Sequence, residues 1–230
     1  MIYIGTHHRC GTVLMRNLFR MYCKKTEQSF FKGIYDSSNL NIDIYQDAHS
    51  REMSAIADAA FGIHLFRDPK SLLLSHLKYH LVSESEAEAS NRILIDGVVY
   101  REYLRSISSD DDKLIFEMNN IFSRTVNAMS GWDYEDERFL NINLKVFLER
   151  TPVEIVDLIT EYFPDCFDRD ALLHSVVAAM NNKVKDRHGT SNQNQLELSA
   201  DLELLLQERF PSLKVFNEST LRTHKKNIIS

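Results

Sequence analysis

MIYIGTHHRCGTVLMRNLFRMY, residues 1–22, opens the chain and decides its fold. Residues 1–5 are short, apolar and closed by a glycine, which is typical of a buried strand. From Thr12 onward the apolar residues recur at helical spacing, as Leu14, Met15, Leu18, Phe19 and Tyr22. The stretch therefore predicts a strand that turns within a few residues into a helix.

Further strands follow along the chain. Residues 41–46 (NIDIYQ) alternate in polarity, residues 61–66 (FGIHLF) form an apolar run, and residues 139–148 (FLNINLKVFL) form another. Pro69 suits the first turn of a helix directly after the second of these runs. Strands that alternate with helices favour an α/β fold, in which a parallel central sheet is flanked by helices.

The second half of the chain is mostly helical by its pattern. SSDDD (108–112) is a favourable helix start, and an apolar stripe that continues to Met129 predicts one long helix. Further helices are predicted at residues 152–163, 169–182 and 199–210. We expect Trp132 to be a core residue, and we expect residues 1–230 to form a single domain.

The composition limits the functional classes. A chain of 230 residues with 43% hydrophobic and 26% charged residues is typical of a globular domain. Its net charge of −6 argues against a nucleic-acid partner, so any polyanion site must be a local basic pocket. The three cysteines are scattered, and no apolar run is long enough for a membrane span. The first predicted strand begins at Met1. We therefore expect a cytoplasmic protein without a signal peptide.

The turn between the first strand and helix has the features of an anion site. Backbone N–H groups at a helix N-terminus are free, and the helix dipole favours negative charge there. Gly11 allows close backbone approach, Thr12 adds a hydroxyl and Arg9 adds a fixed positive charge. The sequence therefore predicts that this turn holds a phosphate or a related anion.

Two common phosphate motifs fit this turn poorly. A nucleotide-hydrolysing loop has the pattern G-x-x-x-x-G-K-[ST], but Gly5 and Gly11 are one residue too far apart and no lysine follows Gly11. Cys10 and Arg16 have the spacing of a cysteine phosphatase, and a helix N-terminus can lower the pKa of a thiol. However, residues 13–15 are apolar and helical, so they cannot wrap a phosphate.

Three motifs in order give a better match. Arg9-Cys10-Gly11-Thr12 follows the first strand; Arg67-Asp68-Pro69 follows the strand at 61–66, with Ser75 eight residues after the arginine; Arg187-His188-Gly189 comes late. This order resembles the PAPS-dependent sulfotransferase family, where PAPS is 3′-phosphoadenosine 5′-phosphosulfate. The resemblance spans nearly the whole chain, and it implies a three-layer architecture like that of P-loop nucleotide hydrolases.

The resemblance also implies a set of site residues. The first loop would hold the 5′-phosphosulfate, while Arg67, Ser75 and Arg187 would hold the 3′-phosphate of PAPS and of its product PAP. The implied cofactor-binding residues are His8, Arg9, Cys10, Gly11, Thr12, Val13, Arg67, Ser75, Arg187 and Gly189. One departure from the family is that residues 143–152 (NLKVFLERTP) lack the acidic stretch that many members carry before this proline.

Catalysis would combine charge stabilisation with a base. Arg9 would stabilise the charge that develops on the leaving oxygen. The family implies a base near residues 45–52, where His49 is the first candidate, because imidazole titrates near neutral pH, and Asp47 is the second. The acceptor would be a hydroxyl, or an amine, of a small molecule or carbohydrate; the sequence predicts neither its identity nor the oligomeric state.

Three other interpretations stay open at this stage. One is a nucleotide kinase or another P-loop phosphotransferase, which would require ATP and magnesium. Another is an inactive nucleotide-binding protein that docks a partner. A zinc site is a third, because His76 and His80 have the i, i+4 spacing of metal ligands. The sequence places no third histidine or carboxylate beside them, so we expect no metal.

Overall fold

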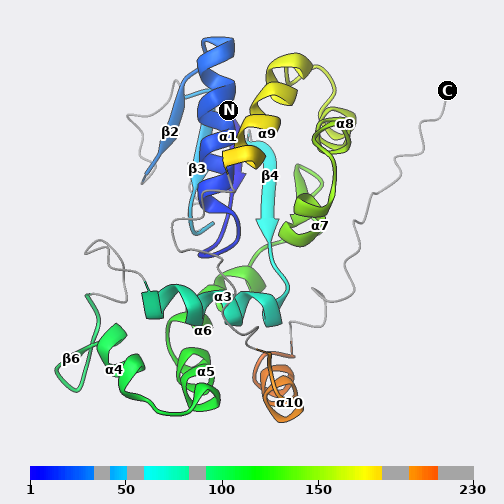
Figure 1. Cartoon of the computed structure of the whole chain (residues 1–230). Coiled ribbons are helices and arrows are strands. Elements are labelled where there is room, and N and C mark those ends of the chain that lie inside the picture. The colour runs from blue at the N-terminus through cyan, green and yellow to red at the C-terminus, as the bar shows by residue number, and fades with distance from the viewer. Residues whose placement is uncertain (34–41, 51–59, 83–91, 183–196, 212–230) are drawn as a thin grey trace.

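The structure is a computed structural model of the chain and describes residues 1–33, 42–50, 60–82, 92–182 and 197–211. Five parallel strands form the central sheet in the order β2-β3-β1-β4-β7 (Figure 1). Their bounds are β1 (Ile2–Gly5), β2 (Phe30–Lys32), β3 (Ile44–Asp47), β4 (Phe61–Phe66) and β7 (Phe139–Asn143). The predicted α/β fold with a parallel sheet flanked by helices is confirmed.

Helices and one small hairpin make up the rest of the described chain. The helices are α1 (Thr12–Thr26), α3 (Pro69–Val82), α4 (Tyr100–Ser106), α5 (Asp110–Asn119), α6 (Ile121–Ser130), α7 (Leu144–Glu149), α8 (Pro152–Tyr162), α9 (Arg169–Asn182) and α10 (Ala200–Arg209). The antiparallel hairpin consists of β5 (Leu94–Ile95) and β6 (Val98–Val99). Within the described ranges, no helix is both long and apolar enough to cross a bilayer.

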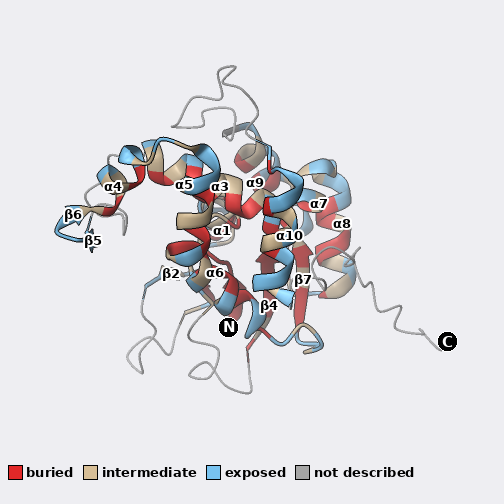
Figure 2. Cartoon of the chain, turned by 90° about the horizontal axis from the view of Figure 1, so that it is seen from below, coloured by how far each residue is buried: buried red, intermediate tan, exposed pale blue. Residues whose placement is uncertain are grey.

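The two faces of the sheet bury different side chains, because successive strand residues point to opposite faces. Ile2 and Ile4 of β1 join a large aliphatic core together with residues of α1, α7, α8 and α9. Tyr3, between them, joins an aromatic cluster on the other face with Tyr45, Trp132 and Phe139. Trp132 is only 7% exposed, so the prediction that it is a core residue is confirmed. Figure 2 shows the buried strands inside helices whose outer sides are exposed.

A second helical group lies beyond the carboxyl ends of the strands. Helices α3, α4, α5, α6 and α10 share their own apolar core, and in Figure 1 they lie below the sheet, where β4 points. Cys10 lies in the loop after β1, and Phe66 is the last residue of β4. Both side chains pack into this core from the side of the sheet. The junction between the sheet and this helical group is therefore lined by the loops that follow β1 and β4.

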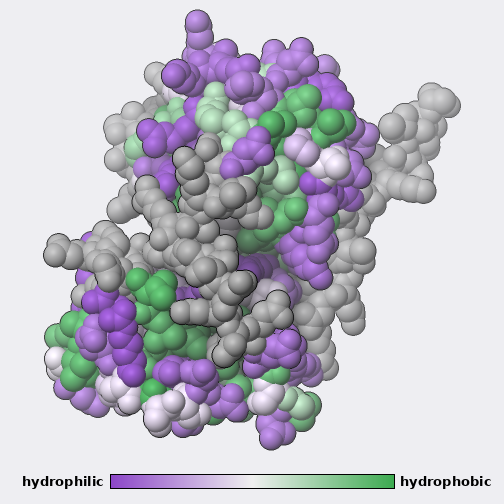
Figure 3. All heavy atoms as spheres, viewed as in Figure 1, coloured by the Kyte–Doolittle hydropathy of each residue, from purple (hydrophilic) through white to green (hydrophobic). Residues whose placement is uncertain are grey.

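The surface offers few large apolar side chains. Leu94 and Val98 of the hairpin are 61% and 44% exposed. Figure 3 shows apolar side chains among hydrophilic ones at the lower left, where Figure 1 places β6 and α4. Leu94 and Val98 belong to different strands and face opposite sides of the hairpin, because Leu94 pairs with Val99 and Val98 pairs with Ile95.

The single long helix predicted after residues 108–112 is wrong, because the structure has two helices there. Helix α5 ends at Asn119 and α6 begins at Ile121, and Asn120 between them has φ −124° and ψ −113°. The side chain of Asn120 donates to the carbonyl of Phe116, and its own carbonyl accepts from Ser123. These local bonds compete with the helical ladder and break it.

The single strand predicted at 139–148 is also wrong in its second half. The strand β7 ends at Asn143, whose side chain accepts a hydrogen bond from the backbone of Lys145 and so starts α7. The strand predicted at 41–46 begins later, at Ile44, and the short elements β2, α4 and the β5–β6 hairpin were not predicted. The strand at 61–66 and the helices near 152–163, 169–182 and 199–210 are confirmed.

Candidate functional site

The loops that follow β1 and β4 lie at a switch point in the sheet. Strand β1 pairs with β3 on one side and with β4 on the other. The chain leaves β1 through α1 toward β2 at one edge, and it leaves β4 toward β7 at the opposite edge. In open parallel sheets, ligands bind at the carboxyl ends of strands where the connections diverge in this way. The topology alone therefore marks this junction as the candidate site.

The first loop is a tight turn that its own side chains hold. Arg9 and Gly11 have φ of 63° and 81°, in the left-handed region. The backbone N–H of Cys10 donates to the carbonyl of His7 over 2.9 Å, and the hydroxyl of Thr12 donates to the same carbonyl over 3.1 Å. An arginine in the left-handed region costs free energy, so the surrounding contacts must hold this conformation.

The start of α1 keeps the properties of an anion site. Gly11 is the N-cap residue, no side chain caps the helix, and its first turn holds no acidic residue. Val13 in that turn is 56% exposed. The first N–H groups of a helix have no partner inside the helix, and the dipole adds positive potential there. A phosphate or sulfate at this end would meet backbone donors without a competing carboxylate.

Residues from the first two predicted motifs contact one another. Arg67 donates from Nη1 to the carbonyl of Arg9 over 3.3 Å. Arg9 donates from Nε to the hydroxyl of Ser75 over 3.1 Å, and its guanidinium lies 4.4 Å from the ring centre of Tyr79. Burial lowers the pKa of Arg67 from its ordinary value, although arginine stays charged at working pH. Two positive charges and one hydroxyl therefore meet at the end of β1.

Cys10 is a buried thiol rather than a nucleophile. Its side chain is fully buried, and burial raises its pKa to about 12 in spite of the neighbouring charges of Arg67 and Arg9. A catalytic cysteine needs a thiolate near neutral pH, so this environment argues against the phosphatase interpretation. The backbone N–H of Cys10 already donates to His7, so it is not directed at a ligand in this state.

The two candidate bases occupy different environments near the same loop. Asp47 ends β3 and is 5% exposed; its carboxylate accepts from the hydroxyl of Tyr3 over 3.1 Å and from the backbone N–H of His49 over 2.9 Å. His49 is exposed; burial is the main cause that lowers the pKa of His7 and His8, and the nearby His49 adds to it. Asp47 therefore positions the turn that carries His49, and the more accessible of the two side chains is the imidazole.

A buried chain of polar side chains runs behind the first loop. Nε1 of Trp132 and Nδ1 of His64 each lie 2.9 Å from the side-chain oxygen of Asn141, and the rings of His64 and Trp132 stack with centroids 3.9 Å apart. The next contact joins Nε2 of His64 to Nε2 of His7 over 2.8 Å. Burial keeps both rings neutral, since it lowers the pKa of His7 to about 3 and that of His64 well below its ordinary value.

The indole N–H of Trp132 fixes the tautomers of His64 and His7 in this hydrogen-bonded series. Trp132 can only donate, so the Asn141 atom that it meets is the oxygen, and Nδ1 of His64 must donate to the same oxygen. A neutral His64 then accepts at Nε2, so His7 donates from Nε2 and keeps a lone pair on Nδ1. That nitrogen is buried and makes no hydrogen bond to the described residues. Sequence patterns gave no sign of this chain, because its members are far apart in the sequence.

Three histidines meet on the other side of the first loop. His8 packs against His76 and His80 of α3, and one ring nitrogen of each lies within 4.8 Å of the others. Nδ1 of His80 lies 2.6 Å from Glu117 of α5. Burial is the main cause that lowers the pKa of His8 to about 3 and that of His76 well below its ordinary value. Only the pair at i, i+4 was visible in the sequence; the fold supplies His8 and the carboxylate.

Arg187 and Gly189, the late motif predicted to complete the 3′-phosphate site, lie outside the described residues. Their predicted role stays a prediction. The structure thus brings together Arg9, Arg67 and Ser75, with Gly11, Thr12 and Val13 at the adjacent helix start.

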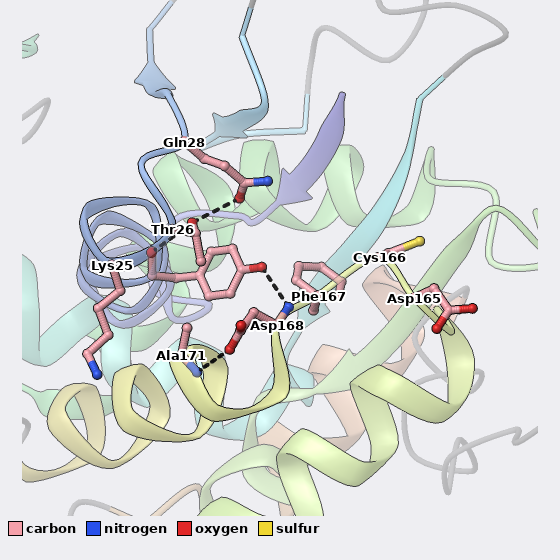
Figure 4. Close-up of a pocket in the computed structure, with 9 residues that line it drawn as sticks. Lys25, Thr26, Gln28, Asp165, Cys166, Phe167, Asp168 and Ala171 are labelled. Carbon is pink, nitrogen blue, oxygen red and sulfur yellow. Dashed lines mark hydrogen bonds between the residues drawn. The ribbon is translucent and has the colours of Figure 1, made fainter.

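A separate hollow lies at the opposite end of α1. It has a volume of about 570 Å³ and lies between the last turn of α1 and the start of α9 (Figure 4). Since α1 has 15 residues, this hollow is roughly 20 Å from the first loop. Polar groups in its wall already bond to each other: the hydroxyl of Tyr22 accepts from the backbone of Asp168, and Thr26 bonds to Gln28. This hollow is thus no extension of the candidate site.

A scan against protein-family models, a search of curated proteins and a search of solved structures each found no match to this chain.

Proposed function

We propose that this protein is a PAPS-dependent sulfotransferase that moves a sulfuryl group to a hydroxyl, or an amine, of a small-molecule or carbohydrate acceptor. The observation that carries the proposal is the contact between motifs 58 and 66 residues apart, in which Arg67 and Ser75 both bond to Arg9. The loops that follow β1 and β4 are neighbours because these strands pair, so the specific support comes from the side-chain bonds between the motifs. These matches meet at the carboxyl ends of β1 and β4.

The fold supports a nucleotide at this place. A five-stranded parallel sheet with a tight turn and helix after its central strand agrees with a P-loop-like architecture. PAPS carries negative charge at two ends, so it needs cationic groups from more than one loop. Arg67 carries five N–H donors and uses one of them on the Arg9 carbonyl, which leaves the planar geometry that binds phosphate in bidentate fashion.

The reaction would proceed by in-line transfer. The acceptor oxygen attacks the sulfur of PAPS, the bond between that sulfur and the bridging phosphate oxygen breaks, and its electron pair stays on the phosphate of PAP. Arg9 and the N-terminus of α1 would stabilise the charge that grows on that oxygen. Because arginine does not release its proton at working pH, Arg9 would act by its charge alone.

The acceptor proton would pass to a base beside the first loop. His49 is exposed and lies close enough to affect the pKa of His7 and His8, so we favour it as the base. Asp47 would act as a positioning residue, since its carboxylate is already bound by Tyr3 and by the His49 backbone. A base variant should reduce kcat without changing PAP affinity.

The test is a ligand comparison on the full-length protein. Thermal shift and calorimetry would compare PAP, ADP, and ATP with and without magnesium. We expect PAP to bind, EDTA to have no effect on it, and ADP to bind much more weakly because it lacks the 3′-phosphate. Arg67→Ala should weaken PAP binding by about 10–100-fold, the worth of a charged hydrogen bond, and should bring PAP close to ADP.

A matched control separates this effect from a general loss of charge. Arg20 is exposed on α1, outside the candidate site, and Arg20→Ala should leave PAP affinity unchanged. Magnesium-dependent binding of ATP in preference to PAP would favour the phosphotransferase interpretation instead. Binding of PAP without turnover of any acceptor would favour the inactive nucleotide-binding interpretation. A preference for PAP that Arg67→Ala leaves intact contradicts the proposed site.

A further inference from the structure

The three histidines described above form a nearly regular triangle of rings. Ring centroids are 4.8 Å apart for His8 and His76, 5.4 Å for His76 and His80, and 5.5 Å for His8 and His80. A zinc–nitrogen bond of about 2.05 Å puts an imidazole centroid roughly 3.2 Å from the ion, so tetrahedral ligands have centroids about 5.2 Å apart. The observed spacing brackets this value.

The ring nitrogens also have the required freedom. Nε2 of each of the three rings is buried and makes no hydrogen bond to the described residues. His76 and His80 are fully buried, so water does not replace the missing partners from the surface. Tetrahedral ligand atoms lie about 3.3 Å apart, whereas one nitrogen from each ring now lies within 4.8 Å of the others. Zinc binding would therefore require the three nitrogens to move closer together.

Glu117 lies behind two of these rings in the place of an outer-sphere partner. Its carboxylate oxygens are 2.6 Å from Nδ1 of His80 and 3.9 Å from Nδ1 of His76. A proton held on Nδ1 by a carboxylate leaves the lone pair on Nε2, which is the tautomer that binds a metal. The contact with Glu117 thus leaves Nε2 of His80 as the nitrogen that can bind a metal.

The charge balance points in the same direction. Glu117 is fully buried in the core of the helical group, where a carboxylate is stable only with a cation or several donors. Three imidazoles next to a buried carboxylate can serve a divalent cation, because they supply nitrogen ligands and one compensating negative charge.

We infer that His8, His76 and His80 bind a zinc ion, with Glu117 orienting His80 from the outer sphere. Three histidines leave one coordination position for water or another oxygen ligand, as in zinc sites that bind exchangeable ligands. Imidazole ligands favour zinc and similar divalent transition metals over magnesium or calcium. The inference does not depend on the proposed sulfuryl transfer, in which no step requires a metal.

The ion would join two parts of the fold. His8 belongs to the first loop, while His76 and His80 belong to α3 of the helical group. The adjacent residue, Arg9, already contacts Ser75 and Tyr79 of the same helix. A bound zinc ion would thus hold the first loop against α3, and it would place its fourth coordination position near the candidate anion site.

The test uses untagged, full-length protein that has been treated with a chelator and then freed of it. Zinc content, competition with a chelating indicator, and cobalt absorption spectra would be measured. We expect one zinc ion per chain, and the intense visible bands of four-coordinate cobalt. His8→Ala changes a half-buried residue on a turn, and it should weaken zinc binding by more than about 100-fold, since outer-sphere changes alone cost 10–100-fold.

Two further variants make the result specific. Glu117→Gln preserves the shape of the outer-sphere partner and should weaken zinc binding by about 10–100-fold. His174→Ala, an exposed histidine on α9, should leave stoichiometry, affinity and the cobalt spectrum unchanged. Far-UV circular dichroism of each variant would show that it is folded. Failure of the unchanged protein to bind one zinc ion, or full zinc affinity in folded His8→Ala, would overturn the inference.

Discussion

A short sequence motif does not show what the fold requires of a single residue such as Gly11 in the first loop. Gly11 and Gly97 have nearly the same positive φ, of 81° and 82°. Their surroundings differ: a Cβ on Gly11 would lie 3.0 Å from Leu144 and 3.1 Å from Leu65, whereas a Cβ on Gly97 would meet nothing within 4 Å. Comparing substitutions at Gly11 and Gly97 therefore distinguishes the effect of a positive φ from the effect of added side-chain volume.

We predict that Gly11→Ala destabilises the protein more than Gly97→Ala. Both substitutions place alanine in the left-handed region, which costs about 1–2 kcal/mol. Only Gly11→Ala also crowds the two leucine side chains, and we expect at least about 1 kcal/mol more from this overpacking. Urea unfolding of the two variants measures the difference, and equal losses would show that the leucines move aside freely.

The cysteines should differ in reactivity as their burial differs. With a pKa of about 12, Cys10 is thiolate in about one molecule in ten thousand at pH 8. Cys23 is buried as well, with a pKa raised by burial to about 11, whereas Cys166 is half-buried. A thiol reagent should modify one cysteine quickly in the native protein and three after denaturation. Cys166→Ser should remove the fast phase; if the fast phase survives, Cys10 or Cys23 is more open than the structure indicates.

At the scale of elements, sequence patterns worked where local signals were complete. The strand at 61–66 has a continuous apolar run closed by Arg-Asp-Pro, and its predicted bounds are those of β4. The helix predicted across Asn120 fails because its apolar stripe continues unbroken while the local hydrogen bonds of Asn120 interrupt the helix. Apolar periodicity reports which side faces the core, but a break in the ladder depends on side-chain bonds to the backbone that periodicity does not contain.

The start of α8 is the clearest local signal, and it yields a prediction. Thr151 accepts from the backbone of Glu154, and Glu154 accepts in return from Thr151, with Pro152 at the first helical position. Thr151→Ala removes the cap and should lower the melting temperature by roughly 2–4 °C in a chain of this size. Val153→Ala is the matched control, because Val153 is 47% exposed in the same turn and should have little effect. Equal melting temperatures for Thr151→Ala and the unchanged protein would contradict the importance of the cap.

At the scale of the whole molecule, the candidate site consists of residues from separate elements that the fold brings together. The family resemblance assigned Arg9 to one charged end of the ligand and Arg67 and Ser75 to the other. The structure places the three residues in direct contact, and their binding roles stay predictions. The histidine and carboxylate cluster could not be predicted, because Glu117 lies 37 residues after His80 and on another helix. Spacing in the sequence reveals partners on one element, whereas partners on different elements depend on how helices pack.

The expectation of one domain stays a prediction, and it can be tested. The aliphatic core of the sheet and the core of the helical group are distinct clusters, and Cys10 of the first loop and Phe66 at the end of β4 reach from the sheet into the second core. We expect the two cores to unfold together. The fluorescence of Trp132, which packs against the sheet, and the circular dichroism signal should then give the same thermal midpoint. Leu77→Ala, in the helical group, should lower both midpoints equally, by about 5–15 °C. A shift in dichroism alone would identify two independent units.

The two turns that contain a left-handed glycine differ in whether inserted residues would fit. Inside the turn from Thr6 to Gly11, an added residue would move an arginine, an imidazole and the start of a helix at once. The turn at Asp96 and Gly97 ends a two-strand hairpin that projects from the helical group, with open space around it. An epitope or a fluorophore could therefore be inserted between Asp96 and Gly97, as a reporter that leaves the chemistry of the other turn undisturbed.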